Sequence, residues 1–335
     1  MSIYLTILFV ICFSYLLITI CKKKMILMNS NGNRHQEFVG NTQTPLIGGI
    51  ILFISLFLFN YDKIGLFLFF MAGIFFIGLF SDLKKFNSPI YRFLIQILLI
   101  VICVYFLNLN LLITRVNFLD YLLKNYIFSI IFTSFCILII INGSNFIDGI
   151  NTLVIGYYLI ICCALIYLQH NGLIVSFFFP LDLLTICLVC LLVFNSFNKL
   201  FLGDSGAYLL GFLFSVELIN LYLQNLNITP FFIILLLWYP AFENLFSIFR
   251  KINFKKSPIF PDTNHLHQLI FSFFKSKKFS STISNNLTGL MINFYNAIIV
   301  GISLINPFNT QFQIILIFFN LIVYTFFYMR LFKYR

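Results

Sequence analysis

The chain has 335 residues, of which 61% are apolar and only 9% charged, with a formal net charge of +11. Soluble domains carry about 25% charged residues, so this composition excludes a soluble globular protein. Apolar runs of roughly 17 to 20 residues recur along the sequence, each long enough to cross a hydrocarbon core of about 30 Å as a helix. Runs such as 64–80 do not alternate in polarity, which excludes a transmembrane β-barrel.

The pattern predicts an all-α polytopic membrane protein, a single integral membrane domain over residues 1–335, with about eleven transmembrane helices. The spans are expected near 3–20, 45–60, 64–80, 92–108, 125–141, 152–169, 181–195, 204–223, 230–249, 289–306 and 311–329. The first span has no small-residue cleavage pattern and is expected to remain, with the N-terminus outside. Alternation then puts the C-terminus in the cytoplasm and leaves only Lys63, Arg115 and Lys124 of the 21 basic residues outside, as the positive-inside rule favours.

The positive charge is explained by loops that face anionic cytoplasmic lipid, so no nucleic-acid partner is expected. Polar, loop-forming residues gather in the inner segments, while the outer loops are short. The active site is therefore expected to be formed by cytoplasmic loops.

The first polar cluster runs from Asn142 to Asn151 and follows an apolar span directly. Asn142 and Asn145 are three residues apart and can share one helix face, and Asp148 adds a carboxylate. A polar turn that leaves the membrane, with Gly143 and Gly149 ending helices, is an equally good interpretation of this cluster alone.

The second cluster, Phe201 to Gly206, places Asp204 between glycines where the eighth span begins. Backbone without side chains lets a ligand approach closely, and a helix N-terminus attracts an anion. The alternative is that Asp204 is a simple N-cap.

The third cluster, Ser257 to His267, belongs to the longest inner loop, expected at 250–286. The H-x-H pair His265 and His267 follows several basic residues, which suits phosphate oxygens better than zinc. Together the three clusters supply carboxylate and carbonyl oxygens for Mg²⁺ and cations for a diphosphate, the requirements of phosphoryl transfer.

In this order, the clusters resemble the polyprenyl-phosphate N-acetylhexosamine 1-phosphate transferases of glycosyltransferase family 4. The matching stretches cover nearly the whole chain: Arg34-His35-Gln36, Pro45 to Gly49, Gly78 to Asp82, Ser88-Pro89 with Arg92, Asn142 to Asn151, Phe201 to Gly206 and Pro261 to His267. The histidine loop P-D-x-N-H-x-H resembles the O-antigen and common-antigen branch, whereas the peptidoglycan branch has a third histidine where this chain has Gln268.

The resemblance implies transfer of an N-acetylhexosamine 1-phosphate, by default GlcNAc 1-phosphate, from a UDP-sugar to undecaprenyl phosphate with release of UMP. It implies Mg²⁺, with Mn²⁺ as the alternative ion, held by Asp204 and Asn145. The implied catalytic residues are Asp82, Asp148 and Asp204. The implied nucleotide-sugar ligands are Asn142, Asp148, Asn151, Arg92, Asn264, His265 and His267. Asp82 would orient or deprotonate the lipid phosphate with the help of Arg34 and His35, and the role of Lys256 stays open.

Two positions depart from the family pattern. Ser81 stands where relatives have the first of two paired aspartates, so that charge is dispensable in this branch, comes from elsewhere, or leaves activity altered. Glu243 stands where many relatives have Asp, and its extra methylene is expected to be tolerated.

Other features have simpler interpretations. Gly48 and Gly49 are expected to allow close helix packing rather than lipid entry. Glu217 is expected near water at the outer end of its span and receives no role. The stretch 269–278 is either an amphipathic segment on the membrane surface or a solvated basic loop.

The rival functions are a transporter or flippase of an anionic lipid-linked substrate, and a catalytically impaired homologue. Internal repeats and midplane charges, typical of transporters, are not found in the sequence. The expected location is the bacterial inner membrane. The sugar (GlcNAc, QuiNAc or FucNAc), the surface polymer, the lipid length and a homodimeric state are left open.

Overall fold

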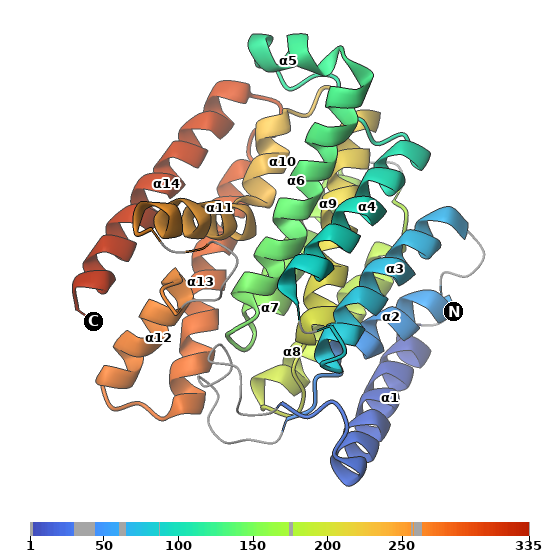
Figure 1. Ribbon diagram of the computed structural model, residues 1–335, viewed down its shortest axis with the longest axis vertical. Helices are drawn as coiled ribbons and strands as arrows, with labels where there is room; N and C mark the ends of the chain where they lie inside the picture. The colour runs from blue at the N-terminus through green and yellow to red at the C-terminus, as the bar shows by residue number, and fades with distance from the viewer. Residues whose placement is uncertain are drawn as a thin grey trace.

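The computed structural model describes residues 3–29, 44–59, 65–86, 88–173, 177–255, 257 and 263–334, and these are largely helical (Figure 1). Between the helices of this described part, the only β-structure consists of isolated bridges. The helices are α1 (Ile3–Lys24), α2 (Gly48–Phe59), α3 (Gly65–Asp82), α4 (Pro89–Phe106), α5 (Asn117–Leu123), α6 (Tyr126–Ile147), α7 (Leu153–His170), α8 (Leu181–Ser196), α9 (Gly203–Gln224), α10 (Pro230–Leu236), α11 (Trp238–Asn253), α12 (Leu266–Ser276), α13 (Ser281–Ser303) and α14 (Thr310–Lys333).

Every predicted span coincides with helix. Eight helices within the described residues are long and apolar enough to cross a membrane, namely α1, α3, α4, α6, α7, α9, α13 and α14. Helices α2 and α8 are apolar but shorter, and α10 with α11 forms one bent pair. The chain is therefore an all-helical, multi-pass membrane protein, while the number of crossings and their orientation remain predictions.

The span predicted at 230–249 is a bent pair of helices rather than one continuous helix. The chain bends by 77° between α10 and α11. Pro240 gives the reason, because in a continuous helix its ring would clash with the carbonyl of Leu236, four residues earlier. In the first turn of a new helix the same proline is tolerated. Accordingly, α11 crosses the direction of the long helices (Figure 1).

Helix α9 lies at the centre of the bundle (Figure 1) and packs most extensively against α3 and α6. Its apolar window is 89% buried, the largest buried share among the candidate spans. Helix α2 also contacts α9, at Gly49, where an added Cβ would lie 2.3 Å from the backbone N of Gly206. The prediction that Gly49 serves close packing is confirmed.

The segment before α9 is fixed by backbone hydrogen bonds to the start of α2. Phe201 N–H donates to the carbonyl of Pro45 at 2.9 Å, and Gly48 N–H donates to the carbonyl of Phe201 at 2.9 Å. Because the two chain segments are about 150 residues apart in sequence, this pairing holds the N-terminus of the central helix in one place.

The predicted loop at 250–286 is mostly helical, which corrects that expectation. It contains the end of α11, the whole of α12 and the start of α13. Helix α12 buries Leu269, Ile270 and Phe271, while Lys275 and Lys277 stay exposed. The stretch 269–278 is thus largely an amphipathic helix, as one alternative predicted, and the solvated-loop alternative is wrong. The position of this helix on a membrane surface remains a prediction.

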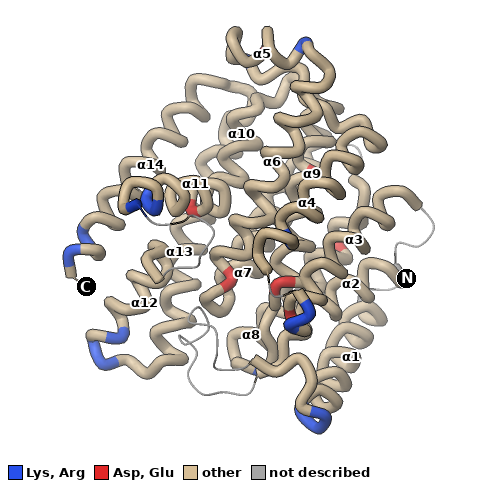
Figure 2. The backbone as a smooth tube through the Cα atoms, viewed as in Figure 1, with Lys and Arg blue, Asp and Glu red and all other residues tan. Residues whose placement is uncertain are grey.

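Figure 2 shows how charge is distributed among the described residues. Basic positions lie at the end of α1, at the α3–α4 turn and beyond α12, in the lower part of the view. The opposite end, which carries α5, is poor in charge. This asymmetry agrees with the positive-inside expectation.

At the end of the molecule that carries α5, Arg115 joins three connections between helices. Its guanidinium donates to the carbonyls of Leu226 and Asn227 at 2.9 and 3.0 Å and to Thr310 Oγ1 at 2.8 Å.

Glu217 does not reach water, contrary to expectation. It is fully buried, because the chain at Phe178 folds over it and donates its N–H to Oε2 at 2.9 Å.

Candidate active site

The N-terminus of α9 is held between two carboxylates. Asp82, the last residue of α3, accepts the backbone N–H groups of Asp204 at 2.8 Å and Ser205 at 3.0 Å. Asp148, which follows α6, accepts the N–H of Gly203. The first N–H groups of a helix have no partner within the helix, and these side-chain oxygens accept their hydrogen bonds. The sequence predicts that this helix N-terminus can face an anion. In the structure, the carboxylate of Asp82 occupies that position.

Gly203 makes this close approach possible. Its φ of +76° is in the left-handed region, and an added Cβ would lie 2.8 Å from Oδ2 of Asp82. A side chain here would be strained and would push the Asp82 carboxylate away from the helix.

The carboxylate of Asp204 is the point where four helices meet. Its Oδ1 accepts the amide N–H of Asn145 at 2.7 Å, from α6. Its Oδ2 accepts Arg92 Nη1 at 2.8 Å, from α4, and the Ser81 hydroxyl at 2.5 Å, from α3. Arg92 Nη1 also donates to the Ser81 hydroxyl. Asp204 is the second residue of α9 and does not cap it, so the N-cap alternative is wrong.

A second polar layer lies behind this cluster. Asn142 donates its amide N–H to Gln96 Oε1 at 3.2 Å and to the carbonyl of Leu138 at 2.9 Å. Gln96 is only 1% exposed and lies one turn beyond Arg92 on α4. Gln96 has no predicted role, although a glutamine within an apolar run, four residues after an arginine, is a usable signal.

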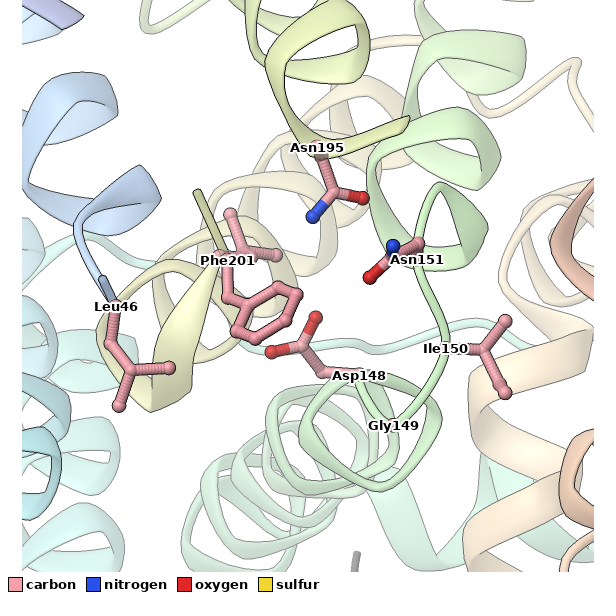
Figure 3. Close-up of a pocket in the computed structure, with 8 residues that line it drawn as sticks. Leu46, Asp148, Gly149, Ile150, Asn151, Asn195 and Phe201 are labelled. Atoms are coloured by element: carbon pink, nitrogen blue, oxygen red, sulfur yellow. The ribbon is translucent and has the colours of Figure 1, made fainter. Parts of the chain in front are cut away.

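Beside the cluster is a small pocket that is open to solvent. Figure 3 shows the carboxylate of Asp148 and the amides of Asn151 and Asn195 pointing toward the same space, next to the ring of Phe201. Leu46, Gly149, Ile150 and Leu202 complete the lining. The carboxylate of Asp148 and the ring of Phe201 are suited to a flat, hydrogen-bonding ligand, whereas the Asn195 amide already bonds to the backbone of Thr152 and Leu200.

Asparagine side chains hold the loop between α6 and α7 that forms one wall of this pocket. Asn285 Oδ1 accepts the backbone N–H of Asn151 at 2.6 Å, and Asn195 Oδ1 accepts that of Thr152 at 2.6 Å. Asn198 accepts from the Asn151 amide. Thr152 has a φ of +64°, so these contacts also hold a strained residue. The polar-turn alternative is wrong in one detail, because Gly143 lies within α6 rather than at its end.

Residues 265–267 of the histidine loop are buried against α11. His265 and His267 are 4% and 0% exposed. Glu243, fully buried on α11, lies 3.0 Å from Nδ1 of His265, 3.9 Å from Nδ1 of His267, and accepts the N–H of Leu266 at 3.1 Å. Glu243 therefore holds this loop in place through hydrogen bonds to His265 and to the N–H of Leu266.

Two further contacts place the loop relative to the pocket. The ring of His265 lies 5.6 Å from that of Phe146, two residues before Asp148. Arg250 donates to the carbonyl of Asn264 and to the hydroxyl of Tyr328 at 3.0 Å. The loop therefore packs against the same end of α6 that carries the acidic cluster.

The cluster carries an excess of negative charge. Asp82, Asp148 and Asp204 face one guanidinium, that of Arg92, which leaves two negative charges when all are ionised. Burial, followed by the charges of Asp204 and Asp82, raises the pKa of Asp148 well above its usual value. A bound divalent cation would relieve this repulsion.

The donor chemistry fits Mg²⁺. No three His, Cys, Asp or Glu side chains converge into a complete metal cage within the described ranges. Mg²⁺ does not need one, because it usually takes one or two protein carboxylates and completes its shell with water and substrate phosphates. Asp204 and Asp148 supply carboxylate oxygens, and the side chain of Asn145 carries an amide oxygen as well as the N–H that now faces Asp204.

The structure thus brings Asp82, Asp148, Asp204, Asn145, Asn142, Ser81 and Arg92 together at one end of α9. Asn151 lines the adjoining pocket, and Asn264, His265 and His267 form the loop beside it. The predicted residues Arg34, His35 and Lys256 lie outside the described residues. Besides Gln96, the residues without a predicted role are Asn195, Asn198 and Asn285, whose partners lie 43 to 134 residues away and cannot be paired from sequence.

Comparisons with known proteins agree with this geometry. Residues 64–222, from α3 through α9, match the model of glycosyl transferase family 4. The matched region contains the whole acidic cluster, whereas the histidine loop lies beyond it.

Three curated proteins are similar to the chain. The probable undecaprenyl-phosphate N-acetylglucosaminyl 1-phosphate transferase of Bacillus subtilis is 31% identical over 42% of this chain and 40% of its own length. The undecaprenyl-phosphate alpha-N-acetylglucosaminyl 1-phosphate transferase of Thermotoga maritima is 26% identical over 75% and 78%. The decaprenyl-phosphate N-acetylglucosaminephosphotransferase of Mycolicibacterium smegmatis is 30% identical over 42% and 39%. The matches thus span about two fifths of the length of the Bacillus and Mycolicibacterium proteins, and residues 64–222 of the chain are similar to glycosyl transferase family 4.

Proposed function

We propose that the protein transfers an N-acetylhexosamine 1-phosphate, by default GlcNAc 1-phosphate, from a UDP-sugar to undecaprenyl phosphate. An oxygen of the lipid phosphate attacks the β-phosphorus of the nucleotide sugar, a new P–O bond forms, and the bond to the α-phosphate breaks to release UMP. In this proposal the enzyme works at the cytoplasmic face of a bacterial inner membrane and starts an O-antigen or another surface polysaccharide.

The observation that carries the proposal is the convergence at the start of α9. Three carboxylates, one guanidinium and the amide of Asn145 lie close together, and one of the carboxylates, Asp148, lines a pocket with polar and aromatic walls. Phosphoryl transfer requires mainly positioning and charge stabilisation, and this set of groups supplies both. The three relatives are named as transferases of this kind.

In this proposal Asp204 is the principal ligand of Mg²⁺, or alternatively Mn²⁺, with Asn145 beside it. The bound cation would withdraw charge from the diphosphate and from the leaving UMP. Asp148 and Asn151 hold the nucleoside, and the ring of Phe201 offers a face on which a uracil ring can stack. Arg92, Asn142 and the histidine loop residues Asn264, His265 and His267 bind the diphosphate and sugar.

Asp82 acts on the lipid phosphate in an orienting role. Both its oxygens already accept backbone N–H groups of α9, which fixes the carboxylate in one orientation. A phosphate monoester is largely ionised near neutral pH because its second pKa is about 6, so the attack does not require a strong base. Arg34 and His35 are proposed to help bind the lipid phosphate.

The test is UMP release by the purified protein in detergent, with undecaprenyl phosphate, Mg²⁺ and a panel of UDP-N-acetylhexosamines. Release that requires both lipid and metal, and that occurs with one sugar, supports the reaction and identifies the donor. Folded protein that binds UDP-sugar and metal but releases no UMP would support an impaired homologue. Folded protein that binds neither would favour a transporter.

A further inference from the structure

Arg92 occupies an unusual position for a cation. It lies in the first turn of α4, near the helix N-terminus, where the helix dipole disfavours positive charge. Its neighbours Tyr91 and Phe93 are 68% and 45% exposed, on a face suited to lipid. The guanidinium nevertheless turns inward to Asp204, so this contact compensates for an otherwise unfavourable location.

Arg92 contacts Oδ2 of Asp204, an oxygen through which a divalent cation would also bind. A carboxylate oxygen has about two acceptor positions. At Oδ2 of Asp204 these are taken by Arg92 and by the Ser81 hydroxyl, and Oδ1 accepts Asn145. A divalent ion on Oδ2 would also lie within a few ångströms of a guanidinium of like charge. Arg92 must therefore leave before Asp204 binds a cation through this oxygen.

Arg92 has an obvious alternative partner. A guanidinium forms strong paired hydrogen bonds with phosphate oxygens, and Asp148, which lies near Asp204, lines the pocket proposed for the nucleoside of the same substrate. Arrival of an anionic substrate would draw Arg92 from Asp204 and expose the carboxylate to the cation.

We infer that Arg92 holds the place of the divalent cation on Asp204 until a phosphate-bearing substrate takes up the guanidinium, so that cation and substrate bind cooperatively. This inference rests on the proposed function. Because coupling between two binding sites is reciprocal, the cation tightens substrate binding by the same factor. Ser81 contributes by bridging the two groups, since its hydroxyl donates to Asp204 and accepts from Arg92.

The experiment measures binding of Mn²⁺ by electron paramagnetic resonance, with protein in detergent and without lipid acceptor, so that no turnover occurs. Mn²⁺ is titrated alone and with UDP-GlcNAc. Arg92→Gln is expected to bind Mn²⁺ alone roughly 5- to 10-fold tighter than wild type, in the usual range of coupling energies, and to lose most of the nucleotide-induced tightening. UMP release by this variant should fall, but the Mn²⁺ affinity decides the question.

Lys85→Gln is the matched control. Lys85 is an exposed cation at the α3–α4 turn whose described contact is with the ring of Phe80. Its removal changes the local charge equally but is expected to alter Mn²⁺ affinity by less than about twofold. If Arg92→Gln does not fold, Ser81→Ala serves instead and should tighten Mn²⁺ binding in the same direction by a smaller factor.

Two contrary outcomes are distinguishable. If wild type releases UMP but Arg92→Gln binds Mn²⁺ no more tightly than wild type or Lys85→Gln, the inference is wrong and the proposed function stands. If folded wild type binds neither Mn²⁺ nor UDP-GlcNAc and releases no UMP, both fall together.

Discussion

The carboxylate of Asp82 accepts the backbone N–H of Asp204 at 2.8 Å, so two acids 122 residues apart are joined through backbone rather than through a shared ligand. The second oxygen of Asp82 binds the next N–H along α9. Asp82 thereby fixes the direction in which the Asp204 side chain leaves the helix, which makes the two acids unequal in role.

Because Asp82 holds the start of α9, its replacement by Asn should lower both activity and thermal stability. In Asp82→Asn one oxygen still accepts an N–H but the amide NH₂ faces the other, so the start of α9 should shift. We expect UMP release to fall by about 10²-fold or more, since small misplacements of catalytic groups have effects of this size. Thermal unfolding should move to lower temperature as well. Near-normal UMP release by Asp82→Asn would show that Asp82 has no role in the reaction.

Asp148 should oppose stability at neutral pH. Because its pKa is raised in the folded protein, the ionised form is disfavoured there, and stability is lost as pH rises from the unfolded value of about 3.9 through the folded one. Asp148→Asn should therefore raise Tm at pH 7.5 in EDTA while lowering UMP release, and the gain in Tm should vanish near pH 4. Asp182→Asn, at an exposed acid in the first turn of α8, is the control and should show no such pH-dependent gain. An equal or lower Tm for Asp148→Asn at pH 7.5 would contradict the explanation.

Glu243 should stabilise the histidine loop. Replacement by Ala leaves the ring nitrogen of His265 and the N–H of Leu266 without this buried acceptor, and we expect a loss of about 2 to 5 kcal/mol. Glu243→Gln keeps one acceptor oxygen and should lose less. Calorimetry gives the ranking, and the KM for the UDP-sugar should rise in the same order. Equal stability of the two variants would show that the loop does not depend on these hydrogen bonds.

Arg115 should matter for stability alone. Arg115→Ala removes several hydrogen bonds to loop carbonyls at the end opposite the candidate site, and about 1 to 3 kcal/mol should be lost. UMP release per folded molecule should be unchanged. Lys124→Ala, at a cation near the same end whose described contact is with the ring of Tyr121, should leave Tm within about 1 °C of wild type. A changed KM in Arg115→Ala would mean that the two ends of the bundle are coupled.

Hydropathy alone locates the helices, because each must present apolar side chains over its length. The bend after α10 also has a local signal in the sequence, Pro240, but a hydropathy profile does not detect it. Helix α5 does not stand out because it is only seven residues long. The amphipathic α12 lies within a segment expected to be a loop, although its pattern is readable once helix is assumed.

The candidate site is only partly readable from sequence for a different reason. Asp82, Asp148 and Asp204 stand out because acids are rare in this chain. Their division of labour depends on hydrogen bonds across more than 100 residues, and so does the attachment of Ser81 to Asp204. The histidine loop illustrates the same limit: its cations and histidines suggested binding of phosphate oxygens, but the burial of both rings beside Glu243 could not be predicted.

The central claim is that the Asp204 cluster transfers a sugar phosphate to a polyprenyl phosphate. The most direct measurement compares wild type, Asp204→Asn and the exposed control Asp182→Asn for transfer of radiolabelled sugar phosphate from UDP-GlcNAc to undecaprenyl phosphate, with Mg²⁺ or EDTA. Wild type and Asp182→Asn should both form labelled lipid only with Mg²⁺, and Asp204→Asn should be slower by about 10²- to 10³-fold or more while remaining folded. Labelled lipid formed at a normal rate by Asp204→Asn would contradict the account.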